Sequence, residues 1–195
     1  MRIHAVLDQL SELEERVGRL YTHFYGKFSD VPAVAGIWWE MALEEHGHAG
    51  ALKMVKELAD PAGQVADVRN RLRPLQAMIK KCERVAAGDI TLREALAMAV
   101  RLERSELDRL GRETVLAIGG NLPPIPRLAF APHEAHLERL MRTVRKFGGE
   151  EVLREAWDLR PEARVRAQAA LARTPARIGA APVARKRKGK DTGRD

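Results

Sequence analysis

The stretch VAGIWWEMALEEHGHAGALKMV, residues 34–55, places two polar side chains on an otherwise apolar side of a helix. Residues three and four positions apart share one side of an α-helix, so apolar residues at this spacing define an inward stripe. Here the stripe is Val34, Trp38, Met41, Glu45, His48, Leu52 and Val55. Glu45 and His48 therefore occupy consecutive core positions, where an unpaired carboxylate is costly unless a cation or a proton accompanies it.

Three further helical segments show the same interruption of an apolar stripe. We expect one helix over about 3–28 and a second over about 32–59. We expect a third over about 91–119 and a fourth from between 124 and 132 to about 148. The polar stripe residues of the other three helices are Glu14, then Glu103 and Glu106, then His133 and His136, with Glu134 at the edge of the last stripe. At ~1.5 Å per residue, Glu14 and Glu45 lie at equal heights on either side of the turn near residues 29 and 30.

Each of these residues also fits an ordinary role when it is taken alone. Glu14 has Glu12 and Glu15 as neighbours and could lie on the surface, while Glu103 and Glu106 stand among arginines that suit a solvated helix side. A single core histidine is more often a hydrogen-bonded or capping residue than a metal ligand. The agreement of four helices on one layer favours a shared metal site over these readings.

Turn and cap residues predict the connections between the helices. Pro32 suits the first turn of the second helix, and the pair Thr91 and Glu94 has the spacing of a capping box. Residues 65–86 also read as helical, with Pro74 expected to kink or divide that segment. Two hairpins joined by this long crossover are typical of a ferritin-like four-helix bundle.

The composition supports an all-α protein. Aromatic residues make up 5% of the 195 residues, and no sustained alternating pattern supports a sheet. The N-terminus has no apolar stretch typical of a signal peptide, and no run reaches the ~18 apolar residues of a membrane span. We therefore expect a soluble cytoplasmic protein without a membrane partner. Because Cys82 is the sole cysteine, any metal must be held by carboxylates and imidazoles.

The positive charge is concentrated at the C-terminus. The formal net charge is +7, and the segment from Arg173 onward carries eight Lys or Arg residues against two Asp residues. We expect a bundle over residues 1–148, a helical extension over 149–172 and a disordered basic tail over 173–195. Nucleic acid is a weak candidate partner, because any contact would rest on this tail alone.

The segment Glu44-Glu45-His46-Gly47-His48-Ala49 contains a Glu-x-x-His pair, which puts a carboxylate and an imidazole on one metal ion. Together with Glu14, the later Tyr21 and the pair Glu103-x-x-Glu106, this segment resembles the rubrerythrin branch of the ferritin-like superfamily over about residues 5–148. In that branch helix four is expected to carry a second Glu-x-x-His. Here the residue three before His136 is His133, with Glu134 beside it.

The resemblance implies a cofactor of two iron ions, with manganese as an alternative. Its implied ligands are Glu14, Glu45, His48, Glu103, Glu106 and His136, with His133 or Glu134 in the remaining place. Tyr21 could donate a hydrogen bond to one of these ligands. The chain has no cysteine-rich rubredoxin module, so an external electron donor would be required. We also expect a homodimer.

Three functions remain open at this point. The first is an oxidoreductase that uses oxygen or hydrogen peroxide, as an oxidase or a peroxidase in oxidative-stress defence. The second is a ferroxidase that oxidises Fe(II) for iron storage or handling. The third is a non-enzymatic bundle that has lost its metal and acts through the basic tail.

Overall fold

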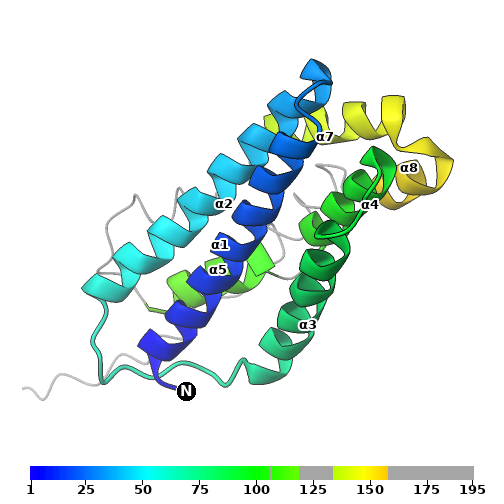
Figure 1. Ribbon diagram of the computed structural model, residues 1–195. Helices are drawn as coiled ribbons and strands as arrows, with labels where there is room; N and C mark the ends of the chain where they lie inside the picture. Colours follow the sequence, from blue (N-terminus) through cyan, green and yellow to red (C-terminus); the bar gives the residue numbers. More distant parts are fainter. Residues whose placement is uncertain (106, 119–133, 158–195) are drawn as a thin grey trace, which may run out of the picture.

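The computed structural model describes residues 1–105, 107–118 and 134–157, without the side chains of residues 134–136 and 155–157. All regular elements in these ranges are helices (Figure 1). They are α1 (Ile3–Lys27), α2 (Pro32–Leu58), α3 (Arg69–Ala86), α4 (Leu92–Glu103), α5 (Leu107–Ala117), α7 (Glu134–Phe147) and α8 (Gly149–Trp157). The all-α prediction is therefore confirmed for the described part of the chain. None of the helices described there is long and apolar enough to cross a membrane.

Helices α1 and α2 form a long antiparallel hairpin (Figure 1). The first helix ends at Lys27 and is capped by Phe28, whose N–H donates to the Phe24 carbonyl, and Pro32 begins the second helix, as the sequence predicts. Tyr21, Phe24 and Trp38 are fully buried between the two helices, and their rings are in contact. This aromatic contact fixes how the two long helices face each other near their turn.

The connection from α2 to α4 passes the N-terminus and then forms a helix of its own. The Ile3 N–H donates to the Gly63 carbonyl, and the Met1 ammonium group donates to the Val65 carbonyl at 2.9 Å. Helix α3 follows and buries Leu72, Leu75 and Ile79 among other residues in the hydrophobic core. Pro74 lies inside α3 and does not divide it, so that alternative of the prediction was wrong. The link from α2 to α4 is long, and its helix α3 belongs to the core.

The predicted third helix is broken in the middle, which corrects the sequence prediction. It begins as expected, because Thr91 and Glu94 form the capping box at the start of α4. Regular helix stops at Glu103, and α5 starts at Leu107. The two pieces have different neighbours: α4 packs on α3, α7 and α8, whereas α5 packs on α1 and α2.

The C-terminal described helices follow the predicted boundaries. Helix α7 ends at Phe147, near the predicted end at about 148, and α8 lies at the start of the helical extension expected over 149–172. Gly149 has a φ of 76°, a conformation that favours glycine. A Cβ on Gly148 would lie 2.8 Å from the Val144 carbonyl oxygen, so glycine is required there too. The predicted start of helix four and the predicted basic tail lie outside the described residues.

Candidate metal site

Four acidic or imidazole side chains from three helices meet between α1, α2 and α5. Glu14 comes from α1, Glu45 and His48 come from α2, and Asp108 comes from α5. Each residue offers one oxygen or nitrogen atom, and these four atoms all lie within 4.8 Å of one another. We call this group the carboxylate–histidine cluster. Its geometry could hold a metal ion.

The two ligands from α2 lie one helical turn apart and face the same way. His48 Nδ1 is 3.4 Å from Glu45 Oε2 and 3.9 Å from Glu14 Oε2. Its other ring nitrogen, Nε2, is 3.9 Å from Glu44 Oε1. The imidazole is therefore surrounded by carboxylates on both sides, and Glu44 can orient it through the nitrogen that faces away from Glu45.

Glu14, Glu45 and His48 are buried, whereas Asp108 is half-buried, and this environment shifts the pKa of Glu14. Glu14 is 0% exposed, and neither of its carboxylate oxygens has a hydrogen-bond partner among the residues that the structure describes. Burial raises the pKa of Glu14 well above its ordinary value, and the negative charges of Glu45 and Asp108 raise it further. In the absence of a metal ion, a proton on Glu14 is the cheapest way to reduce this repulsion.

His48 responds to the same carboxylates in the opposite sense. Burial disfavours the charged imidazole, but the hydrogen bond and the charge of Glu45 outweigh burial and raise the pKa of His48 to about 9. A protonated His48 thus balances part of the negative charge. Protons take the place that a divalent cation would fill, and metal binding would release them.

Tyr21 and Glu103 lie beside the cluster. The Tyr21 hydroxyl donates to Glu103 Oε1 at 3.3 Å, and its ring stacks on Trp38 with 6.0 Å between the ring centroids. Burial raises the pKa of Tyr21 well above 10, and the charge of Glu103 adds to this, so the hydroxyl keeps its proton and remains a donor. Tyr21 therefore holds Glu103 in place next to the four clustered residues.

The structure brings together three of the predicted ligands and leaves others undescribed. Glu14, Glu45 and His48 meet as expected, and Glu103 lies near them. The remaining predicted ligands lie outside the described residues, or have side chains that do: Glu106, His133, Glu134 and His136.

Sequence reasoning missed Asp108. On one continuous helix this residue does not follow the apolar stripe that runs through Glu103. The break before α5 changes its position, and Ser105 marks the break, because its hydroxyl accepts a hydrogen bond from the Leu107 N–H at 3.3 Å. Ser105-x-x-Asp108 has the Ser/Thr-x-x-Asp/Glu spacing of a helix start. The same type of signal correctly predicted the start of α4.

The donor set favours particular metals. Three carboxylates and one imidazole are hard to intermediate ligands, which suit iron, manganese and zinc better than the soft ion Cu(I). A divalent cation would also give the two unpartnered Glu14 oxygens an electrostatic partner, and it would relieve the repulsion among three carboxylates. The residues present therefore fit a metal ion of this class.

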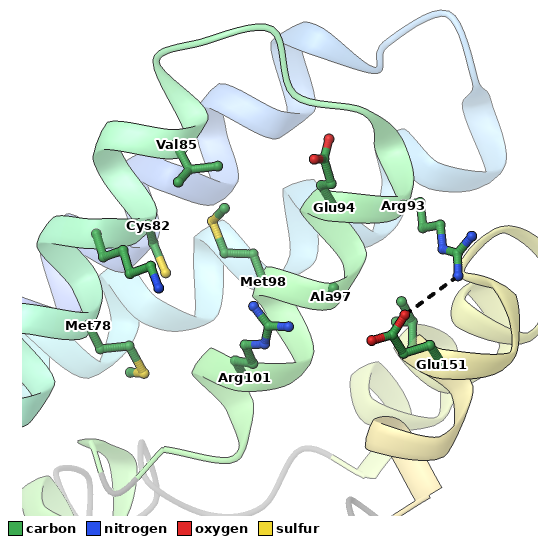
Figure 2. Close-up of a pocket in the computed structure, with 11 residues that line it drawn as sticks. Met78, Cys82, Val85, Arg93, Glu94, Ala97, Met98, Arg101 and Glu151 are labelled. Atoms are coloured by element: carbon green, nitrogen blue, oxygen red, sulfur yellow. Dashed lines mark ion pairs between the residues drawn. The ribbon is translucent and has the colours of Figure 1, made fainter.

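A separate pocket of about 410 Å³ lies where α3, α4 and α8 meet (Figure 2). Its lining is largely apolar, with Met78, Cys82 and Met98 facing the space and Arg101 at its border. Burial raises the pKa of the Cys82 thiol, so the thiol form is favoured. None of the four cluster residues lines this pocket, so the pocket and the carboxylate–histidine cluster are separate features of the fold.

Comparison of the chain with protein-family models, curated proteins and solved structures gives no match.

Proposed function

We propose that this chain is an iron-dependent oxidoreductase of the rubrerythrin-like, ferritin-related type, with the carboxylate–histidine cluster as its metal centre. The observation that carries the proposal is the fully buried Glu14 carboxylate, which has no hydrogen-bond partner in the described part of the chain and lies with Glu45, His48 and Asp108 within 4.8 Å. In a core with a purely structural role, we would expect such a carboxyl group to be hydrogen-bonded or replaced by an apolar side chain. An unsatisfied buried carboxyl costs ~1–3 kcal/mol or more. Metal binding would turn this cost into stability of the folded state.

The four cluster residues would hold the ion from three different helices. Glu45 and His48 come from one turn of α2 and so form a rigid pair, whereas Glu14 and Asp108 come from other helices and complete the site only in the folded chain. Tyr21 fixes Glu103 beside them through its hydroxyl. Bound iron would supply the electrons for reducing oxygen or hydrogen peroxide, and an external donor would restore them.

We propose two iron ions, with the four clustered residues as ligands of the first. Glu103, which accepts the hydrogen bond of Tyr21, would serve a second ion together with Glu106 and the helix-four residues His133, Glu134 and His136. The proposed architecture is a ferritin-like bundle in which α1 and α2 form one hairpin and α3 lies in the long crossover. The contacts of α1 and α2 with α5, and of α2 with α7, support this arrangement.

Anaerobic Fe(II) titration of the full chain, followed by elemental analysis, tests the metal site. We expect at least about one iron per chain for the wild type, and a clear loss in Asp108→Asn, since this ligand lies in the observed cluster. The matched control is Asp89→Asn, which changes an exposed carboxylate outside the cluster. Iron content below about one per chain after loading, with Asp108→Asn no different from wild type, would sink the metal proposal.

Turnover experiments then separate the redox functions. Iron-loaded protein that consumes hydrogen peroxide over many cycles with a chemical reductant is a peroxidase. If the loaded protein only oxidises added Fe(II) in proportion to the iron it takes up, it is a ferroxidase. Absence of both activities in protein with full iron content would contradict the oxidoreductase proposal while leaving the metal site intact.

A further inference from the structure

Helix α2 is apolar on its outer side as well as on its buried side. Four large apolar side chains point to solvent: Trp39 is 52% exposed, Leu43 54%, Met54 45% and Leu58 53%. A surface helix normally carries charged residues on its outer side. At about 100° per residue these four residues fall, with Gly47 and Gly50, within one arc of about 100°. Glu40 and Glu57 lie at the edges of this arc, near its two ends. We call this set of six residues the outer face of α2.

The two glycines open the middle of the outer face. A Cβ built on Gly47 or Gly50 would meet no atom within 4 Å, so nothing in the described fold requires glycine at either position. Glycine inside a helix is destabilising relative to alanine, so two unexplained glycines on one exposed line suggest that something approaches the backbone there. Between Leu43 and Met54, this arc carries no charged residue.

Along the outer face, the order of large and small side chains is nearly the same when it is followed from the N-terminal end or from the C-terminal end. Trp39 and Leu43 are large, Gly47 and Gly50 are small, and Met54 and Leu58 are large again. When a twofold axis relates two antiparallel helices, a residue on one side of the axis faces the residue of the other copy that lies equally far on the other side. Two copies of this pattern would place glycine against glycine at the centre, where the helices approach most closely, and large apolar residues against each other on both sides.

We propose that the outer face of α2 binds the same face of a second copy of this chain, antiparallel and about a twofold axis. Leu43 of one copy would then pack near Met54 of the other, with the crossing point between Gly47 and Gly50. This inference does not depend on the proposed function. Glu45 and His48 lie on the opposite side of α2, where both are buried.

The exposed area fits what a homodimer requires. Tyr25 of α1 is 39% exposed and contacts the Trp39 ring at 5.6 Å between centroids, which extends the patch onto α1. Half-exposed side chains of this size each present on the order of 100 Å², so Tyr25 and the four large residues of the outer face present roughly 500 Å² per copy. A standard interface buries about 800 Å² per partner, and about 65% of it is apolar in homodimers.

The charges around the outer face also favour a second copy over a charged partner. On the side of α7, Glu40 pairs with Arg139, and on the side of α1, Lys53 pairs with Glu15. Lys56 pairs with Asp8 at 2.7 Å. These pairs neutralise one another within one chain and form a polar border around an apolar centre, as in protein–protein interfaces. Nucleic acid would need a border with a positive excess instead.

Sedimentation velocity of the full chain at several concentrations tests the proposal. We expect a dimer for the wild type, and a dissociation constant at least about 30-fold higher for Leu43→Lys, which puts a charge in the apolar contact beside the crossing point. The matched control is Leu116→Lys, because Leu116 is 55% exposed on α5 and lies off this face. The control should dimerise like the wild type.

Gly50→Gln keeps the test decisive if Leu43→Lys folds poorly. Glutamine is a better helix former than glycine and meets open space in the single chain, so the diluted monomer should melt at a higher temperature. The same side chain blocks the crossing point, so dimerisation should weaken. A wild type that stays monomeric at about 100 µM, or a Gly50→Gln variant that dimerises as tightly as wild type, would overturn the proposal.

Discussion

Replacing Glu14 by leucine should stabilise the metal-free protein and abolish its stabilisation by metal. In the metal-free fold, both carboxylate oxygens of Glu14 are buried, and no described residue forms a hydrogen bond with them. Removing an unsatisfied buried polar group recovers ~1–3 kcal/mol. In a domain of this size, about 2 kcal/mol corresponds to a rise in Tm of roughly 4–8 °C. Metal at 100 times its Kd should stabilise the wild type by about 2.7 kcal/mol, and Glu14→Leu should lose most of that gain.

The assay is thermal unfolding with and without Fe(II) under anaerobic conditions, or with Mn(II) in air. Glu12→Leu is the matched control, because Glu12 is an exposed residue of the same helix. It should leave the metal-dependent shift unchanged. The two effects of Glu14→Leu have opposite signs, which an ordinary core residue would not produce. A Glu14→Leu protein that is less stable without metal and still gains the wild-type shift with metal would refute the reasoning.

Three further predictions concern the second ligand-bearing segment and two local stabilising contacts. Asp108→Asn should reduce the metal-dependent rise in Tm, whereas Asp89→Asn should not, as measured by differential scanning fluorimetry. Arg16 donates two hydrogen bonds to Glu83, at 2.8 and 2.6 Å, and thereby lowers the pKa of Glu83. The pair therefore stabilises the fold at neutral pH and loses its effect as the pH falls through the lowered pKa. Glu83→Gln should cost no more than about 1 kcal/mol at neutral pH, because solvent screens this partly exposed pair, and much less in acid, as measured by urea unfolding at each pH. Thr91→Ala removes the α4 cap and should lower the free energy of unfolding by about 1 kcal/mol in the same urea assay.

The sequence predicts the first hairpin and the meeting of Glu14, Glu45 and His48 because local signals and the apolar period agree there. Pro32 fixes the start of α2, so the distances of Glu14 and Glu45 from the turn give their common height. The i, i+3 spacing then places His48 beside Glu45. No comparable signal fixes the height of the later ligands, because several prolines stand before α7 and leave the start of that helix open over many positions.

Pro74 shows a second limit of prediction from the sequence. A proline inside a helix removes one hydrogen bond and disfavours the helix by ~3 kcal/mol, which is why we predicted a kink or a division there. Helix α3 nevertheless continues through Pro74, and Leu72, Leu75 and Ile79 on its buried side lie in the core. Burial of three such side chains contributes ~1.5–3 kcal/mol each, which is enough to outweigh the local penalty. Packing decides such cases, and packing partners are distant in sequence.

The missed ligand follows from the break between α4 and α5. Asp108 lies five residues after Glu103, which on an uninterrupted helix means about 140° around the axis, so the two could not point to one site. The break lets the two pieces pack independently, α4 on α3, α7 and α8, and α5 on α1 and α2. Only the second set of contacts brings the first turn of α5 to Glu14, Glu45 and His48. Asp108 stands in that turn, where the helix N-terminus favours a negative charge. The irregularity that an apolar period cannot predict is thus what completes the carboxylate–histidine cluster.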